Sequence, residues 1–274
     1  RIRRANVQLL PNASIQTSET GMRHRTAERV ARQTGYPVIS VSQSMRIISL
    51  YVDGKRHVLE PSESILASAN QALSALERYK ARLDQTSAGL DSLEIEDLVT
   101  VRDVTSVLQL MEMVRRISDD IDSYVLELGT DGRLLALQVE ELTRGLLAEH
   151  GFLLEDYLPE GLDTATVDAR LKWVGSPALL DLAMVARSMG LGGIDGQDLD
   201  AQVSPRGLRI LSKIPRLPVV TARAVVEQWG SLQGVLGATI EELEAVEGVG
   251  AQRARTLRDG LSRLAEISVV ERYA

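Results

Sequence analysis

The feature that most constrains the fold is an internal repeat near the end of the chain, where apolar and small residues recur 32 positions apart. The first copy runs from Leu208 to Val225, and the matching positions of the second run from Ile240 to Leu257. Such self-similarity indicates one supersecondary unit used twice, because a single copy cannot bury its apolar face. The apolar residues recur at helical spacing, so we predict two helical hairpins packed against each other.

The second copy contains Val246-Glu247-Gly248-Val249-Gly250-Ala251-Gln252-Arg253-Ala254, which resembles the helix-hairpin-helix signature. Two glycines permit a tight turn and expose backbone N–H groups at the start of the next helix. A nucleic-acid phosphate can bind there, which positions a strand without reading its bases. We therefore predict sequence-independent DNA binding by Gly248, Val249, Gly250, Arg253 and Arg255.

In the first copy, Arg216 and Pro218 stand in place of the two glycines. We expect this hairpin to pack as a structural partner, with Arg216 as a further phosphate contact. The alternative is a purely structural or protein-binding pair. Residues 204–274 hold 10 Lys or Arg against 8 Asp or Glu, a weak positive balance that keeps this alternative open.

A second basic feature lies near the beginning, where Arg23, His24 and Arg25 precede a predicted helix over residues 25–34. Backbone N–H groups make a helix N-terminus partly positive, so cations there are mildly unfavourable unless an anion binds. The N–H donors, two guanidinium groups and the hydroxyl of Thr26 suit phosphate oxygens. We interpret the stretch as an exposed polyphosphate site; the alternative is a solvated basic turn.

The run Gly-Met-Arg-His-Arg-Thr-Ala-Glu-Arg over residues 21–29 continues with Gln-Thr-Gly-Tyr-Pro-Val-Ile-Ser-Val-Ser over 33–42. Together they are similar to the second nucleotide-binding motif of diadenylate cyclase domains, above all those of the DNA integrity scanning branch. The resemblance implies that Arg23, His24 and Arg25 are catalytic. It also implies an ATP site formed by Gly21, Met22, Arg23, His24, Arg25 and Thr26. Met22 stands where relatives usually have threonine, so one phosphate-facing hydroxyl is expected to be missing.

The same resemblance implies a reaction in which two ATP molecules give cyclic di-AMP and two pyrophosphates, with Mg²⁺ or Mn²⁺ as cofactor. It further implies a cytoplasmic homo-octamer that senses branched DNA. The family's metal-holding carboxylate belongs to an Asp-Gly-Ala motif, and no such triplet occurs among these 274 residues. The metal ligand and the general base are therefore unassigned, and we expect the chain alone to be nearly inactive as a cyclase. Its opening residues, strand-like and without a start methionine, suggest a beginning inside a catalytic domain.

Composition supports a mostly helical chain without disulfides. Aromatic residues make up 3%, so the core must be aliphatic, and the absence of cysteine excludes thiolate metal sites. No apolar run approaches membrane-spanning length. We predict an α+β domain fragment over 1–60, an all-α linker domain over 61–203 and a tandem helix-hairpin-helix domain over 204–274.

Within this plan we expect strands near 3–9, 37–42 and 45–52, followed by a tight turn at Asp53-Gly54. A helix should begin at Ser62, a second should be capped by Asp91, and a third should cover 177–189. The competing functional interpretation is a non-catalytic DNA-binding module whose N-terminal part only packs or oligomerises. A recombination or repair accessory that merely carries the tandem hairpin would explain residues 208–264 but not residues 21–44.

Overall fold

The computed structural model describes residues 2–43, 47–193 and 198–273. They form two compact units, one made of residues 1–72 with 121–136 and the other of residues 73–120 with 137–274. The predicted domain boundaries at 60 and 203 stay predictions.

The first unit contains a three-stranded antiparallel sheet in the order β1 (Val38–Ser42), β2 (Ile47–Val52) and β3 (Lys55–Leu59). Val38 pairs with Tyr51 at one end of β1, and β2 pairs with β3 through the register Val52 to Lys55. The intervening turn has positive φ at both central residues, 50° at Asp53 and 71° at Gly54. Positive φ at both central residues is typical of a type I′ turn, whose backbone matches the right-handed twist of the two strands it joins. The Asp53-Gly54 prediction is confirmed; the expected start of the second strand, at 45, lies outside the described residues.

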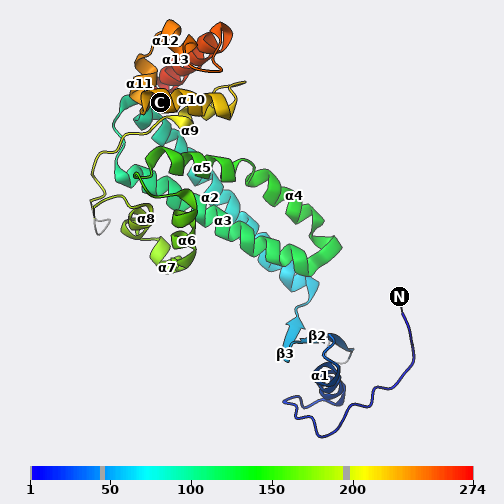
Figure 1. Ribbon diagram of the computed structural model, residues 1–274. Coiled ribbons are helices and arrows are strands. Elements are labelled where there is room, and N and C mark those ends of the chain that lie inside the picture. Colours follow the sequence, from blue (N-terminus) through cyan, green and yellow to red (C-terminus); the bar gives the residue numbers. More distant parts are fainter. Residues whose placement is uncertain (1, 44–46, 194–197, 274) are drawn as a thin grey trace. The chain divides into compact units, whose positions relative to one another are not determined.

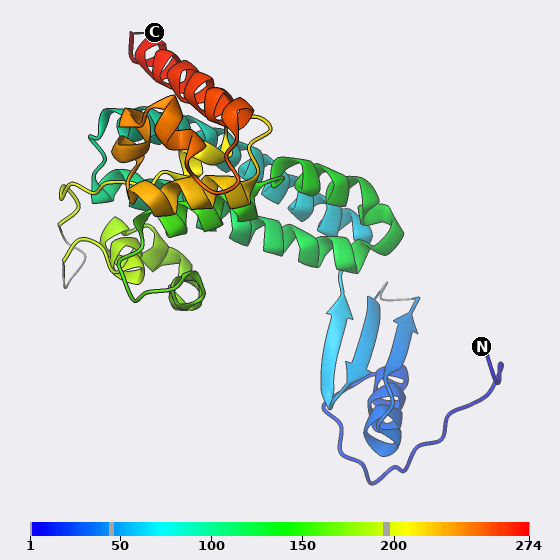
Figure 2. The same cartoon turned by 45° about the horizontal axis from the view of Figure 1, so that its top comes forward.

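Helix α1 (Met22–Thr34) packs on one face of this sheet, against β1 and β2 (Figure 2). It ends at Gly35, which has φ of 70° and donates its N–H to the Ala31 carbonyl, as predicted. Its beginning is a correction, because the helix starts at Met22 rather than at residue 25. Gly21 is the N-cap, so the three basic residues occupy the first turn instead of preceding it.

The predicted strand over residues 3–9 is wrong. Residues 2–10 have no strand conformation, and Ile2 and Leu10 are each more than 80% exposed. A strand needs a neighbour that accepts and donates backbone hydrogen bonds, and none of the described residues pairs with this segment. Residues 12–17 instead lie along the side of α1. There the Arg29 and Arg32 guanidinium groups of the helix donate to the Ile15 and Gln16 carbonyls, each at 2.8 Å.

The helical region begins with two long helices, α2 (Ser62–Glu96) and α3 (Val101–Leu128), shown in Figure 1. The prediction that Asp91 caps a second helix is wrong, because α2 continues through it. The break comes at Asp97, whose φ is 57°, and the Asp103 carboxylate then accepts from the backbone N–H of Thr100 at 2.9 Å. Further helices follow: α4 (Arg133–Leu142), α5 (Leu146–Tyr157), α6 (Thr164–Trp173), α7 (Ser176–Leu179) and α8 (Leu182–Met189). The helix predicted over 177–189 is thus two helices, α7 and α8.

The repeat forms two helical hairpins, as predicted. The first joins α9 (Leu208–Ser212) to α10 (Val219–Trp229), and the second joins α12 (Ile240–Glu244) to α13 (Ala251–Tyr273), with α11 (Leu232–Gly237) between them. Equivalent apolar residues of both copies share one core, including Leu211 with Leu243 and Val225 with Leu257. The predicted fold class is confirmed: a small α+β domain, a helical linker and a tandem helix-hairpin-helix domain.

Candidate nucleotide and nucleic-acid sites

The first turn of α1 offers unpaired hydrogen-bond donors. Gly21 has an extended conformation, with ψ of 139°, and no side chain caps the helix. No acidic residue lies in the first turn. Within the described residues nothing accepts from the backbone N–H groups of Arg23 and His24, and the first intrahelical bond runs from Arg25 N–H to the Gly21 carbonyl at 2.9 Å. An anion at this end would meet both free donors and the positive end of the helix dipole.

The exposed side chains of this turn fit phosphate binding in part. Arg23 is exposed, with no hydrogen-bond or ion-pair partner among the described residues. Arg25 is exposed and makes only long contacts, from Nε to the Glu19 carbonyl at 3.4 Å and from Nη2 to the Thr20 carbonyl at 3.3 Å. The Thr26 hydroxyl donates to the Met22 carbonyl at 2.9 Å, and Met22 itself is 84% exposed. The two guanidinium groups are therefore available to an anion, whereas the proton of Thr26 is committed to its own helix.

The expectation that all three basic residues are exposed is wrong for His24, which is only 6% exposed. The His24 side chain lies on the face of α1 that packs on the sheet, and its Nδ1 is 3.1 Å from the hydroxyl oxygen of Tyr51 in β2. Burial, followed by the nearby Glu19 carboxylate, raises the pKa of Tyr51 to about 12. His24 therefore contributes to the packing of α1 on the sheet as well as to the predicted site.

In the second hairpin, the structure separates the roles of the signature residues. Gly248 has φ of 82°, and its carbonyl accepts from the Arg253 guanidinium at 2.7 Å. Val249 is buried and donates its N–H to the Val246 carbonyl at 2.9 Å, so it holds the turn in the core. Gly250 is not at positive φ, and a Cβ added there would meet no atom within 4 Å. The expectation that both glycines are required by the turn is thus corrected: only Gly248 is.

The two hairpins differ in their basic residues. Arg216, the counterpart of Gly248, adopts φ of 64° despite its side chain and is exposed. Arg223, the counterpart of Arg255, is held by the Glu155 carboxylate of the linker at 2.7 Å. Arg255 is exposed, and no described residue pairs with it by hydrogen bond or ion pair. The second hairpin is therefore the one with an uncommitted arginine on its second helix.

A buried ion-pair network, which sequence reasoning missed, joins the linker to the first hairpin. Arg209 of α9 and Glu94 of α2 have fully buried side chains, 2.7 Å apart between Nη2 and Oε2. The same guanidinium lies 2.6 Å from Oδ1 of Asp91 and 3.1 Å from the Ser87 hydroxyl. Glu94 also accepts from the Tyr157 hydroxyl at 2.6 Å, and burial raises the pKa of its carboxyl. No local pattern could have found a pair 115 residues apart.

A second buried carboxylate fixes the beginning of α9. Asp156 accepts from three successive backbone N–H groups, those of Gly207, Leu208 and Arg209, at 2.7–2.9 Å. N–H groups at the start of a helix have no partner within the helix, so the carboxylate supplies their acceptor. Its negative charge also interacts favourably with the partial positive charge at that helix end. Burial is the main cause that raises the pKa of Asp156, to about 7. Linker and first hairpin are thus one packed body.

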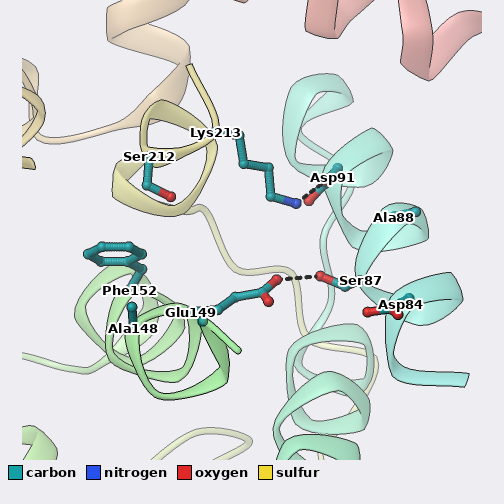
Figure 3. Close-up of a pocket in the computed structure, with 10 residues that line it drawn as sticks. Asp84, Ser87, Ala88, Asp91, Ala148, Glu149, Phe152, Ser212 and Lys213 are labelled. Atoms are coloured by element: carbon teal, nitrogen blue, oxygen red, sulfur yellow. Dashed lines mark hydrogen bonds and ion pairs between the residues drawn. The ribbon is translucent and has the colours of Figure 1, made fainter. Parts of the chain in front are cut away.

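An open pocket lies beside this network, between α2, α5 and α9 (Figure 3). It has a volume of about 410 Å³, and its polar walls come from Asp84, Ser87, Asp91, Glu149 and Lys213. Two of its carboxylates are already paired. Glu149 accepts from Ser87 at 2.9 Å, and Asp91 is paired with Lys213. The pocket therefore completes the linker–hairpin contact and is not assigned a ligand.

Among residues 2–43, 47–193 and 198–273, no group of three or more His, Asp or Glu side chains is placed to hold a metal ion. No ligand set among the described residues is assigned to the expected Mg²⁺ or Mn²⁺. None of the helices that the structure describes combines the length and apolar character that crossing a membrane requires.

Comparison with known families covers most of the chain. Residues 1–56 match the DisA bacterial checkpoint controller nucleotide-binding family, and residues 59–197 match the DisA bacterial checkpoint controller linker region. Residues 208–263 match the SAM-like helix-hairpin-helix tandem family. Fold and sites thus define a protein with a nucleotide-binding domain, a helical linker and a tandem helix-hairpin-helix.

Relatives over the whole chain narrow this class further. The chain is 58% identical to the DNA integrity scanning protein DisA of Acidothermus cellulolyticus, covering 100% of this chain and 75% of the relative. The corresponding proteins of Streptomyces coelicolor and of a Parafrankia strain are each 56% identical, with 74% and 77% of their lengths covered. The chain belongs to the DisA family.

Proposed function

We propose that this chain is part of a diadenylate cyclase that joins two ATP molecules into cyclic di-AMP, releases two pyrophosphates and responds to branched DNA. The observation that carries the proposal is the first turn of α1, with its free N–H groups and two exposed arginines. That arrangement suits a triphosphate, because charge-assisted hydrogen bonds to phosphate are the strong ones. The DisA relatives and the nucleotide-binding family match support the same class of activity.

In this proposal Arg23 and Arg25 hold the triphosphate and stabilise the charge that develops on it and on the leaving pyrophosphate. The backbone N–H groups at the start of α1 supply further donors to phosphate oxygens. The divalent cation, Mg²⁺ or Mn²⁺, has no ligands assigned among the described residues, so no step is derived through it. The octameric assembly and the cytoplasmic location are proposed on the resemblance alone.

ATP binding by this chain tests the nucleotide part. We expect Arg23→Ala with Arg25→Ala to weaken ATP binding at least tenfold, since each charged contact to phosphate contributes about 1.5–3 kcal/mol. The matched control is Arg78→Ala with Arg82→Ala, which removes two exposed arginines from α2. Equal ATP affinity of the two double variants would refute the phosphate role.

Cyclase activity is a separate test. Because the 274 residues contain no Asp-Gly-Ala, we propose that the chain alone forms little or no cyclic di-AMP from ATP with Mg²⁺ or Mn²⁺. Product analysis after incubation checks this, and robust synthesis would show that the motif is dispensable.

DNA binding should be weak, sensitive to salt, and located in the second hairpin. Gly250→Val is an informative change, because a Cβ added there meets no atom within 4 Å in the free protein, while it would approach a phosphate bound at the hairpin. The same substitution at Gly237, outside the hairpin signature and equally open, is the control. If Gly250→Val binds branched DNA at low salt as well as Gly237→Val does, the hairpin assignment fails. If the unmodified chain binds branched DNA but does not bind ATP, the non-catalytic DNA-binding module is favoured instead.

A further inference from the structure

Behind the first turn of α1, four side chains form a continuous line of polar contacts. His24 Nδ1 lies 3.1 Å from the Tyr51 hydroxyl oxygen, and that hydroxyl lies 3.1 Å from Oε1 of Glu19. The Arg56 guanidinium completes the line, with Nη1 3.1 Å from Oε1 and 3.2 Å from Oε2 of Glu19. His24 and Tyr51 are both buried, whereas Arg56 reaches the surface.

Counting protons along this line settles which group donates to which. An ionised carboxylate only accepts, so the hydrogen bond between Tyr51 and Glu19 uses the single proton of the tyrosine hydroxyl. The hydroxyl oxygen can then only accept from the other side. The histidine must therefore donate from Nδ1, and in a singly protonated ring this leaves Nε2 with the lone pair.

Nε2 is buried and has no hydrogen-bond partner among the described residues in either tautomer, so the contacts of the Tyr51 hydroxyl decide between them. If it carried the proton, a buried N–H donor would be unpaired, and Nδ1 would need the Tyr51 proton that Glu19 accepts. The alternative tautomer thus exchanges an unpaired acceptor at Nε2 for an unpaired N–H donor and also breaks the hydrogen bond from Tyr51 to Glu19, although the carboxylate keeps its contacts with Arg56. Because burial and Glu19 raise the pKa of Tyr51 to about 12, the hydroxyl keeps its proton at neutral pH.

We propose that Tyr51, held by Glu19 and Arg56, is a positioning residue that fixes His24 in the Nδ1-protonated form and makes Nε2 a hydrogen-bond acceptor. The consequence for catalysis rests on the proposed nucleotide function. Arg23 and Arg25 can donate to phosphate oxygens, whereas the Nδ1 proton of His24 is already given to Tyr51. The three basic residues therefore divide into two exposed phosphate donors and one buried imidazole that holds the first turn of α1 on the sheet.

The tautomer can be measured directly in this chain by long-range proton–nitrogen NMR correlation, which distinguishes protonated from unprotonated ring nitrogens. The chain has three histidines, so loss of one signal set in His24→Gln assigns the resonances of His24. At neutral pH we expect a protonated Nδ1 and an unprotonated Nε2. A protonated Nε2 in the unmodified chain would overturn the proposal without any variant.

Tyr51→Phe tests the positioning role, because it removes the acceptor of the Nδ1 proton and keeps the ring. We expect the His24 nitrogen signals to move toward the Nε2-protonated form or to average between the two. Tyr36→Phe is the matched control, since Tyr36 is 75% exposed and should leave His24 unchanged. An unaltered tautomer in Tyr51→Phe would show that Tyr51 does not set it. These spectra need no ATP, so failure of the ATP-binding test would remove the proposed function and leave the tautomer assignment intact.

Discussion

Replacing Arg209 by methionine gives the sharpest test of how the linker holds the first hairpin. Methionine fills much of the same volume but removes the charge that faces Glu94, and both side chains are fully buried. Removing one partner of such a pair leaves an uncompensated buried charge and typically costs 3–5 kcal/mol. The loss of the contact with Asp91 adds little to this cost, because Asp91 is partly exposed and remains paired with Lys213. In a unit of 150–250 residues this corresponds to a melting temperature about 6–20 °C lower.

The deficit should also depend on pH, with a defined sign. Burial already raises the pKa of Glu94, and the loss of Arg209 removes the main opposing interaction. A carboxyl whose folded pKa lies above its unfolded pKa binds more protons in the folded state. The variant therefore loses further stability as pH rises above the unfolded value of about 4.3. We expect a smaller deficit at pH 5 than at pH 8.

Urea unfolding at both pH values measures the free energies of unfolding. Arg255→Met is the matched control, because Arg255 is exposed and unpaired within the described residues, and it should change stability by less than about 0.5 kcal/mol. Adding Glu94→Gln to Arg209→Met should recover part of the loss, since it removes the orphaned charge. A deficit below about 1 kcal/mol, or one that Glu94→Gln leaves unchanged, would refute the view that this pair fastens the hairpin.

Three further predictions address the other positions. Gly248→Ala should lower the free energy of unfolding by about 1–2 kcal/mol, because φ is 82° at this position. Gly250→Ser should leave the free energy of unfolding nearly unchanged, because serine suits the residue before a helix. Equal effects of the two variants in denaturant titrations would contradict the assigned turn. Asp156 has a pKa raised to about 7 by burial, so its contribution should fall as pH rises from about 4 to 7, and Asp156→Asn should flatten that part of a melting-temperature profile. Arg23→Ala with Arg25→Ala should leave the melting temperature unchanged or raise it slightly, because two cations are removed from a helix N-terminus. His24→Ala should lower the melting temperature, because only His24 of the three is buried. Melting temperatures equal to that of the parent for all variants would contradict the packing of His24.

Local signals predicted much of the fold. The Asp53-Gly54 turn, the glycine that ends α1 and the 32-residue repeat each follow from residues close together in the sequence. The errors have physical causes. Residues 3–9 look like a strand by composition, but pairing decides strands. Asp91 resembles a helix cap, yet its carboxylate pairs with Arg209 and Lys213 instead, which no local rule could foresee.

The candidate sites were predictable as residue types but not as arrangements. The basic turn at Arg23 and Arg25 and the glycine hairpin both carry sequence signatures. The burial of His24 depends on which face of α1 meets the sheet, and its proton position depends on Tyr51, 27 residues away. The commitment of Arg223 to Glu155 likewise spans 68 residues. Such relations arise only when the chain is packed.

The pairing of Arg223 with Glu155 sets how steeply DNA affinity should depend on salt. Affinity falls with a logarithmic slope of about 0.9 per phosphate neutralised on duplex DNA. With Arg223 committed to the linker, a single chain offers Arg216, Arg253 and Arg255, so its slope should be about 3. A steeper measured slope would require more chains on the same DNA, each contributing its own hairpin. The salt slope therefore counts the chains that bind together.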